Sequence, residues 1–229
     1  YRWNAQLFAA RGAVVAMLNP RGSTGYGQRF TDQISGDWGG KCWEDVRLGL
    51  DHVLEKYRFV DRKRLAAAGA SFGGFLVNWI AGRTDRFRAL VTHDGIFQAE
   101  TMAYTTEELW FDEHEHGGMP HENRKAFLRV SPHLNVSRFR TPTLVVHGEQ
   151  DFRCPISEGL GMFTALQVMK VPSRLLVFPD EGHWVLRPAN AEVWYHEVIG
   201  WLMRHLGPSK KARPRRRRAP SRSAGRKGP

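Results

Sequence analysis

Cysteine and long apolar runs are both scarce in this sequence. Its 229 residues include two cysteines, Cys42 and Cys154, which lie far apart and show no metal-ligand spacing. The sequence therefore indicates neither a disulfide framework nor a zinc site, and packing is the favoured role of both thiols. No apolar run approaches the roughly 18 residues of a membrane-spanning helix. The first residues also lack the charged, apolar and cleavage regions of a signal peptide, which leaves cytoplasmic and exported locations both open.

Acidic residues are absent from residues 207–229, although the whole chain contains 23 of them. This segment holds ten of the 34 Lys and Arg residues, so the remaining 24 basic residues nearly balance the acidic ones. The net charge of +11 thus belongs to the C-terminal segment, and the rest of the chain carries about +1. Because the segment has almost no apolar residue to bury, we expect a disordered basic tail. No aromatic residue is interleaved for base stacking, so we favour a solvated extension over a nucleic-acid-binding arm.

Short apolar runs alternate with helical patterns through residues 1–206, which is typical of βαβ units. We expect one α/β domain with a mostly parallel sheet flanked by helices, because buried parallel strands are continuously apolar. The predicted strands are Ala13–Leu18, Arg64–Gly69, Ala89–His93, Thr143–His147 and Leu175–Phe178.

The helical patterns predict four helices between and after these strands. One has its apolar face from Trp43 to Tyr57, and the others cover Phe72–Gly82, Ser157–Lys170 with Ser157 as N-cap, and Ala189–Leu206.

A long polar and aromatic excursion, Gly95–Arg140, separates two of the predicted strands. Excursions of this length are usually functional, so we expect it to cover or wall the mouth of a site. It contains His114-Glu115-His116, with His121 nearby. This cluster lacks the His-Glu-x-x-His pattern of a zinc helix, so we expect a polar rim and no metal.

The pentapeptide Gly69-Ala70-Ser71-Phe72-Gly73 matches the pattern Gly-x-Ser-x-Gly. It lies between an apolar strand and a helix, which is the setting of a nucleophile elbow. Its glycines permit the tight turn that exposes the Ser71 hydroxyl at the end of the sheet. In this arrangement the backbone N–H of Phe72 points to the place where a substrate oxyanion forms.

A serine nucleophile needs a general base and an acid that orients the base. Asp151 and His183 each follow a predicted strand, and both stand after Ser71 in the chain order Ser, acid, His. Glu149 and Asp180 compete with Asp151 for the role of the acid. His93 and His147 stand at strand ends, where packing is the favoured role. The predicted chemistry needs no cofactor.

The sequence resembles the catalytic domain of the prolyl oligopeptidase family of serine peptidases, most closely its acylaminoacyl-peptidase and dipeptidyl-peptidase 5 branch. The segments that carry this resemblance are Asn19–Gly27, Gly36–Gly40, Gly69–Gly74, Glu107–Phe111, His147–Asp151 and Asp180–Trp184. The resemblance implies an α/β-hydrolase fold and hydrolysis of short peptides through an acyl-enzyme. It also implies that Arg153 binds a substrate backbone carbonyl and that Trp110, Phe111 and Tyr104 wall the S1 pocket.

Two features of the family have no counterpart in the sequence. Family members carry an N-terminal β-propeller, and a His-Gly-Gly-Pro-like loop upstream of the helix resembling Trp3–Arg11 supplies a second oxyanion donor. We therefore expect residues 1–206 to be an N-terminally truncated catalytic domain, without its first strands and with little activity alone. The alternatives are an esterase or other acyl hydrolase of the same fold, and an inactive fragment that acts as a binding module.

Overall fold

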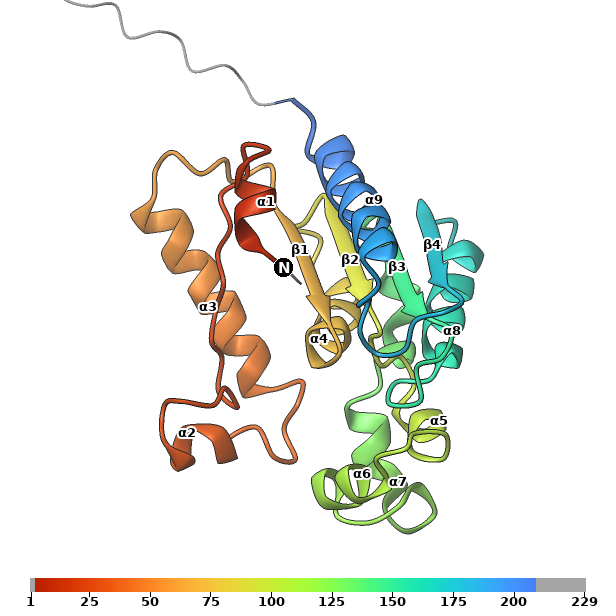
Figure 1. The fold of residues 1–229 in the computed structure, drawn as a ribbon. Coiled ribbons are helices and arrows are strands. Elements are labelled where there is room, and N and C mark those ends of the chain that lie inside the picture. The colour runs from red at the N-terminus through yellow and green to blue at the C-terminus, as the bar shows by residue number, and fades with distance from the viewer. Residues whose placement is uncertain (1–2, 209–229) are drawn as a thin grey trace, which may run out of the picture.

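A computed structural model describes residues 3–208 of the chain. It contains a sheet of four parallel strands in the order β1 (Ala66–Ala70), β2 (Ala89–His93), β3 (Thr143–Gly148) and β4 (Ser173–Phe178) (Figure 1). This confirms the predicted parallel sheet and four of the five predicted strands. The register pairs Ala70 with His93 and His93 with Val146, so β1, β2 and β3 end side by side. The loops that follow these strands therefore meet at one edge of the sheet.

Helices cover both faces of the sheet, and each face has its own core. On one face, α3 (Lys41–Lys56), α4 (Phe72–Ala81) and α8 (Ile156–Val168) contribute to a cluster that includes Leu90 and Val145. On the other, α9 (Pro188–Leu206) packs on Ala89 and Val91, and α1 (Ala5–Ala9) lies nearby. Alternate residues of β2 thus enter opposite cores, as the pleat of a strand requires.

The long excursion between β2 and β3 folds into short helices. They are α5 (Ala99–Ala103), α6 (Leu109–His116), α7 (Pro120–Arg129) and the 3-10 helix η1 (Pro132–Arg138). Figure 1 shows α5, α6 and α7 beyond the C-terminal ends of the strands. The excursion therefore lies on the side of the sheet where the loops after the strands converge.

The predicted strand Ala13–Leu18 is wrong. The segment runs apart from β1 towards α2 (Gln28–Asp32), and no strand of the described residues pairs with it. Its side chains are largely exposed, with Val14 at 55% and Met17 at 74%. An extended segment becomes a strand only when a neighbour accepts its backbone hydrogen bonds. Its apolar character alone could not supply that neighbour.

One predicted cap is also wrong. Helix α8 begins at Ile156 with Pro155 at the N-cap, so Ser157 lies inside the first turn and makes no cap. Proline suits a helix start because its φ is fixed and its missing N–H has no partner to lose.

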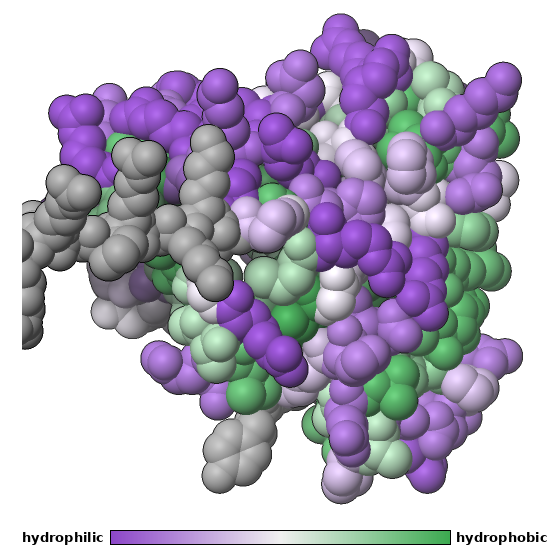
Figure 2. Space-filling model, turned by 90° about the horizontal axis from the view of Figure 1, so that it is seen from above, coloured by the Kyte–Doolittle hydropathy of each residue, from purple (hydrophilic) through white to green (hydrophobic). Residues whose placement is uncertain are grey.

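No helix of the described residues has the length and apolarity that crossing a membrane requires. Seen from above, hydrophilic residues cover most of the face in Figure 2, with smaller hydrophobic groups between them. Of the basic segment 207–229, Gly207 and Pro208 alone lie within the described residues. The predicted basic tail therefore falls outside them.

Candidate active site

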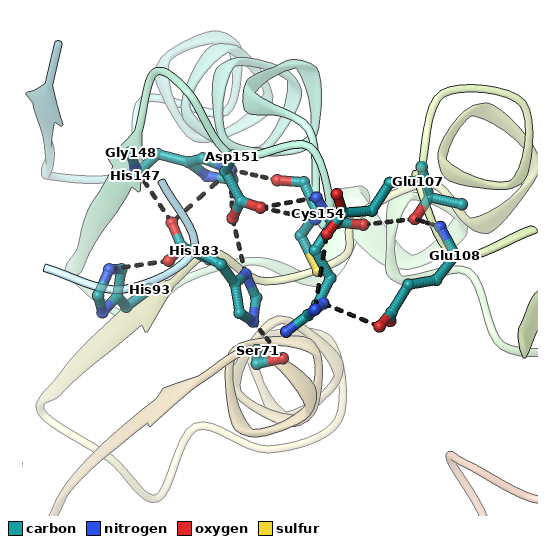
Figure 3. Close-up of polar contacts among 12 residues, drawn as sticks. Ser71, His93, Glu107, Glu108, His147, Gly148, Asp151, Cys154 and His183 are labelled. Carbon is teal, nitrogen blue, oxygen red and sulfur yellow. Dashed lines mark hydrogen bonds and ion pairs between the residues drawn. The ribbon is translucent and has the colours of Figure 1, made fainter. Parts of the chain in front are cut away.

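Ser71 occupies a tight turn between β1 and α4. Its backbone has φ 57° and ψ −121°, an unusual conformation for a residue with a side chain. A side chain at Gly69 would collide with the backbone of Gly73, and one at Gly74 would lie 2.6 Å from the His93 carbonyl oxygen. The two glycines are therefore required by close backbone approach. The resulting turn places Ser71 directly after β1, with its hydroxyl facing His183 (Figure 3).

Ser71, His183 and Asp151 form one line of hydrogen-bonded side chains (Figure 3). The His183 Nε2 atom lies 2.9 Å from the Ser71 Oγ atom, and the His183 Nδ1 atom lies 2.8 Å from the Asp151 Oδ2 atom. Since a carboxylate only accepts, Nδ1 carries a proton and the neutral ring leaves Nε2 free to accept from the serine hydroxyl. This arrangement can remove the Ser71 proton when the hydroxyl attacks an acyl group.

The Asp151 carboxylate is held by three donors. Its Oδ1 atom accepts hydrogen bonds from the backbone N–H groups of Arg153 (2.9 Å) and Cys154 (3.0 Å), and its Oδ2 atom faces His183. The two competitors lie elsewhere. Glu149 is exposed, and Asp180 pairs with Arg187 at 3.1 Å. The geometry therefore favours Asp151 as the acid.

Glu181, which the sequence analysis missed, fixes the loop that carries His183. Its buried carboxylate accepts hydrogen bonds from the backbone N–H groups of Leu186 and Arg187 and from the Asn190 side chain. An acidic residue just before Gly182-His183 was the available signal. Its partners became visible only once the loop was folded against α9.

Phe72 is the first residue of α4, directly after Ser71. The first N–H groups of a helix have no acceptor within the helix, and they carry partial positive charge. The Phe72 N–H can therefore stabilise the oxyanion that forms on a carbonyl oxygen when the Ser71 hydroxyl attacks the carbonyl carbon.

Arg153 lies between two carboxylates that precede α6. Its Nε atom is 3.0 Å from a Glu108 oxygen, and its Nη2 atom is 3.5 Å from a Glu107 oxygen. The backbone reinforces this contact, because Glu107 N donates to the Phe152 oxygen at 2.7 Å. The loop after β3 and the start of α6 are thereby joined beside the triad (Figure 3). Guanidinium donors remain for a further acceptor, since Arg has five N–H groups.

The three predicted pocket aromatics differ in their surroundings. Phe111 packs on Trp38 at 5.5 Å between ring centroids, and Trp38 packs edge-on against Phe72 at 5.8 Å. Phe111, Trp38 and Phe72 thus form a series of packed rings that connects the helical excursion to α4, the helix that follows Ser71. Trp110 is 66% exposed, and Tyr104 is 56% exposed with its hydroxyl accepting from His121 N. Phe111 is therefore the one of the three that the structure links to the elbow.

The His114-Glu115-His116 cluster is structural. Glu115 accepts a hydrogen bond from the Trp38 ring nitrogen at 2.8 Å, and His116 is buried against Phe127 at 4.2 Å. The predicted polar rim is thus wrong for His116, because its ring packs in the core against the tilted rings of Phe127 and Trp38. His114 is exposed as expected.

Burial raises the pKa values of two titratable groups near the site, Cys154 and Glu158. It raises the pKa of the Cys154 thiol well above its usual range, which disfavours the reactive thiolate and fits a packing role. Burial also raises the pKa of Glu158 to about 7, although hydrogen bonds from Phe97 N and Gln98 N oppose the shift. Through these two hydrogen bonds, Glu158 holds the start of the helical excursion that follows β2.

A model of the prolyl oligopeptidase family matches residues 1–209. The chain belongs to this family. Dipeptidyl-peptidase 5 of Schizosaccharomyces pombe is 47% identical over 206 residues, covering 89% of this chain and 30% of the relative. Dipeptidyl-peptidase 5 of Aspergillus oryzae is 45% identical over 210 residues, covering 90% of this chain and 29% of the relative. The chain therefore spans about 30% of the length of the curated relatives it matches.

Solved structures agree with this assignment. An acylaminoacyl peptidase of Pyrococcus horikoshii superposes with a TM-score of 0.80 at 26% identity, covering 85% of this chain and 32% of that one. A puromycin-hydrolysing peptidase of Mycobacterium tuberculosis gives a TM-score of 0.76 at 27% identity, covering 82% and 29%. These matches confirm the predicted α/β-hydrolase fold and the predicted resemblance to serine peptidases of the prolyl oligopeptidase family.

Proposed function

We propose that this chain carries the catalytic centre of a serine peptidase that hydrolyses short peptides through an acyl-enzyme on Ser71. The observation that supports this most strongly is the hydrogen-bonded line from Ser71 through His183 to Asp151. It stands at the carboxyl ends of parallel strands, where open α/β sheets place their sites. Membership of a peptidase family favours peptides as substrates.

In the proposed reaction, the Ser71 Oγ atom attacks the scissile carbonyl carbon while His183 takes the hydroxyl proton. The Phe72 N–H stabilises the resulting oxyanion. When the C–N bond breaks, His183 returns its proton to the leaving amine. A water molecule then attacks the Ser71 ester by the same route, which releases the acid and restores the hydroxyl. Asp151 keeps the His183 ring oriented and stabilises its positive charge throughout.

Arg153 is proposed to bind a backbone carbonyl of the substrate near the scissile bond. Its guanidinium stays charged and donates in a fixed geometry, and Glu107 and Glu108 hold it in place. Phe111 is proposed to wall the S1 pocket, with the exposed Trp110 and Tyr104 at its outer edge. The names of the S. pombe and A. oryzae relatives favour dipeptides as the released product.

The proposed catalytic centre also needs a region of the protein that lies outside this chain. The curated relatives are about three times as long as the matched region. The proposal places two features in the remainder: a β-propeller, and a separate loop of the hydrolase fold that supplies a second oxyanion donor. Loss of one such donor costs roughly 10²–10³ in turnover. Residues 1–206 are therefore expected to turn over peptides slowly when isolated.

The proposal is tested by comparing a chromogenic dipeptide amide with an ester of the same acyl group on the protein at its natural length. We expect turnover of the amide that Ser71→Ala abolishes. Ester turnover without amide turnover would instead identify an esterase of the same fold. No Ser71-dependent turnover, together with salt-sensitive anion binding by residues 207–229, would favour the binding module.

A further inference from the structure

A second buried carboxylate, Asp94, lies directly behind the triad. It follows the last residue of β2, is 1% exposed and has φ 48°, a left-handed conformation. Asp tolerates this conformation better than most residues with side chains. The proposed mechanism gives Asp94 no task, although its carboxylate lies within 4.8 Å of a carboxylate oxygen of Asp151. Two acids so close together, both out of water, are costly and call for a reason.

The Asp94 carboxylate contacts one residue with each of its oxygens. Its Oδ2 atom lies 2.9 Å from the His93 Nε2 atom, and its Oδ1 atom accepts a hydrogen bond from Gly148 N at 3.2 Å. Gly148 is the last residue of β3 and the first of the loop that carries Asp151. The Asp94 carboxylate therefore fixes the start of the loop that carries Asp151, from Gly148 to Cys154, which we call the acid loop.

His147 fixes the other end of the same loop. Its Nε2 atom donates to the Cys154 carbonyl oxygen at 2.7 Å, and it lies 3.7 Å from Asp94 and 3.8 Å from Asp151. The His147 Nε2 atom therefore lies close to the carboxylates of both Asp94 and Asp151. The loop from Gly148 to Cys154 is held at both ends by buried polar side chains.

The dipeptide His93-Asp94 also holds the backbone of the nucleophile Ser71. The His93 carbonyl oxygen accepts a hydrogen bond from Ser71 N at 2.9 Å, while the Asp94 side chain holds Gly148. His93 and Asp94 therefore connect the elbow after β1 with the acid loop after β3. The distance from Ser71 to Asp151 depends on this connection.

A metal ion is an alternative reason for the cluster, since Asp94, His147 and Asp151 are ligand types with atoms close together. The hydrogen bond to Cys154 argues against it. A carbonyl oxygen only accepts, so the His147 Nε2 atom carries the proton and offers no lone pair to a cation. The Asp151 oxygens are already occupied by His183, Arg153 and Cys154.

We propose that Asp94 is a positioning residue of the triad, which sets Asp151 against Ser71 and adds a second buried negative charge behind His183. This inference rests on the proposed acyl-transfer function. The charge matters because a buried carboxylate stabilises the imidazolium that forms when His183 takes the serine proton. The groups that face Asp94 are His93, His147, Asp151 and the Cys154 thiol. The charge of Asp94 also acts on this loop: burial raises the pKa of that thiol most, followed in order by the charges of Asp151, Asp94, Glu158 and Asp112.

The test compares Asp94→Asn with Asp112→Asn in the protein at its natural length. Asp112 is a matched control, because it is also 1% exposed and its partner His116 is likewise buried, at 3.6 Å. We expect Asp94→Asn to lower kcat roughly 10- to 100-fold with little change in KM. The acidic limb of its kcat/KM profile should move to lower pH by about one unit, since the protonated base is less favoured. Asp112→Asn should leave that limb in place.

Two outcomes would overturn the role of Asp94, and a second variant covers the case in which Asp94→Asn does not fold. If wild type has Ser71-dependent turnover and both Asn variants share its kcat and pH profile, the role of Asp94 is overturned while the proposed function stands. If wild type has no such turnover, the proposed function itself fails, and Asp94 has nothing to position. If Asp94→Asn does not fold, His93→Gln replaces it, because this variant removes the 2.9 Å partner and keeps the charge. Its kcat should then fall with the pH limb unmoved, and an unchanged kcat would contradict the proposal.

Discussion

Strands β2 and β3 are buried along their whole length, whereas β1 lies at the edge of the sheet and is only half-buried. The groups that follow β2 and β3 are fixed by contacts within the described residues, as the bonds of Asp151 and Asp94 show. On the side of β1, the apolar segment Ala13–Leu18 faces solvent. This chain therefore holds Asp94 and Asp151 in place with its own residues, whereas the apolar residues of its N-terminal side remain exposed.

The sharpest prediction concerns the catalytic edge. Asp151→Asn should lower kcat by about 10⁴, because the amide disturbs the His183 tautomer that receives the serine proton. Glu149→Gln, two residues earlier and exposed, is the matched control and should change kcat less than about twofold. Steady-state kinetics on the protein at its natural length gives both values. Equal losses in the two variants would mean that the acid has been misassigned.

A second prediction compares the two regions by stability. Phe75 on α4 is fully buried, and Phe75→Ala should lower the free energy of unfolding by about 3–5 kcal/mol. Met17 is 74% exposed, and Met17→Ala should change it by less than about 0.5 kcal/mol. Urea denaturation of this chain measures both. A Met17 effect as large as that of Phe75 would show that the N-terminal segment is packed in solution and would remove the difference between the regions.

The third prediction is a pH dependence at the root of the helical excursion. Burial raises the pKa of Glu158 from 4.5 to about 7, so the folded protein holds a proton that the unfolded chain releases. The stability from this proton is present at low pH and is lost as the pH rises through about 7. Between pH 4.5 and about pH 8, wild type should lose up to about 3 kcal/mol relative to Glu158→Gln. Parallel pH profiles of the two proteins would contradict this account.

The sequence predicted what local patterns determine. The strand Ala89–His93 and the elbow around Ser71 were predicted because apolar runs, glycine spacing and chain order are visible without a fold. Ala13–Leu18 looked like its neighbours, but strand pairing is a non-local property that no single segment encodes. The tasks of Asp94 and Glu181 were missed for the same reason. Each binds backbone N–H groups whose positions follow from tertiary packing.

The position of Asp94 nevertheless left a signal in the sequence. It follows a predicted strand directly, as Asp151 follows the next one after a short loop, and the ends of parallel strands converge. The neighbouring His93 is predicted only to pack, so the sequence alone gives the pair no further role.

We propose that Ser71 is an activated nucleophile held in place by this chain's own fold. Treating folded residues 1–229 with a fluorophosphonate probe and locating the adduct by mass spectrometry tests it directly, because labelling does not require substrate binding by a partner region. We expect an adduct on Ser71 that His183→Ala removes. A folded chain that remains unlabelled, or that is labelled at another serine, would contradict it.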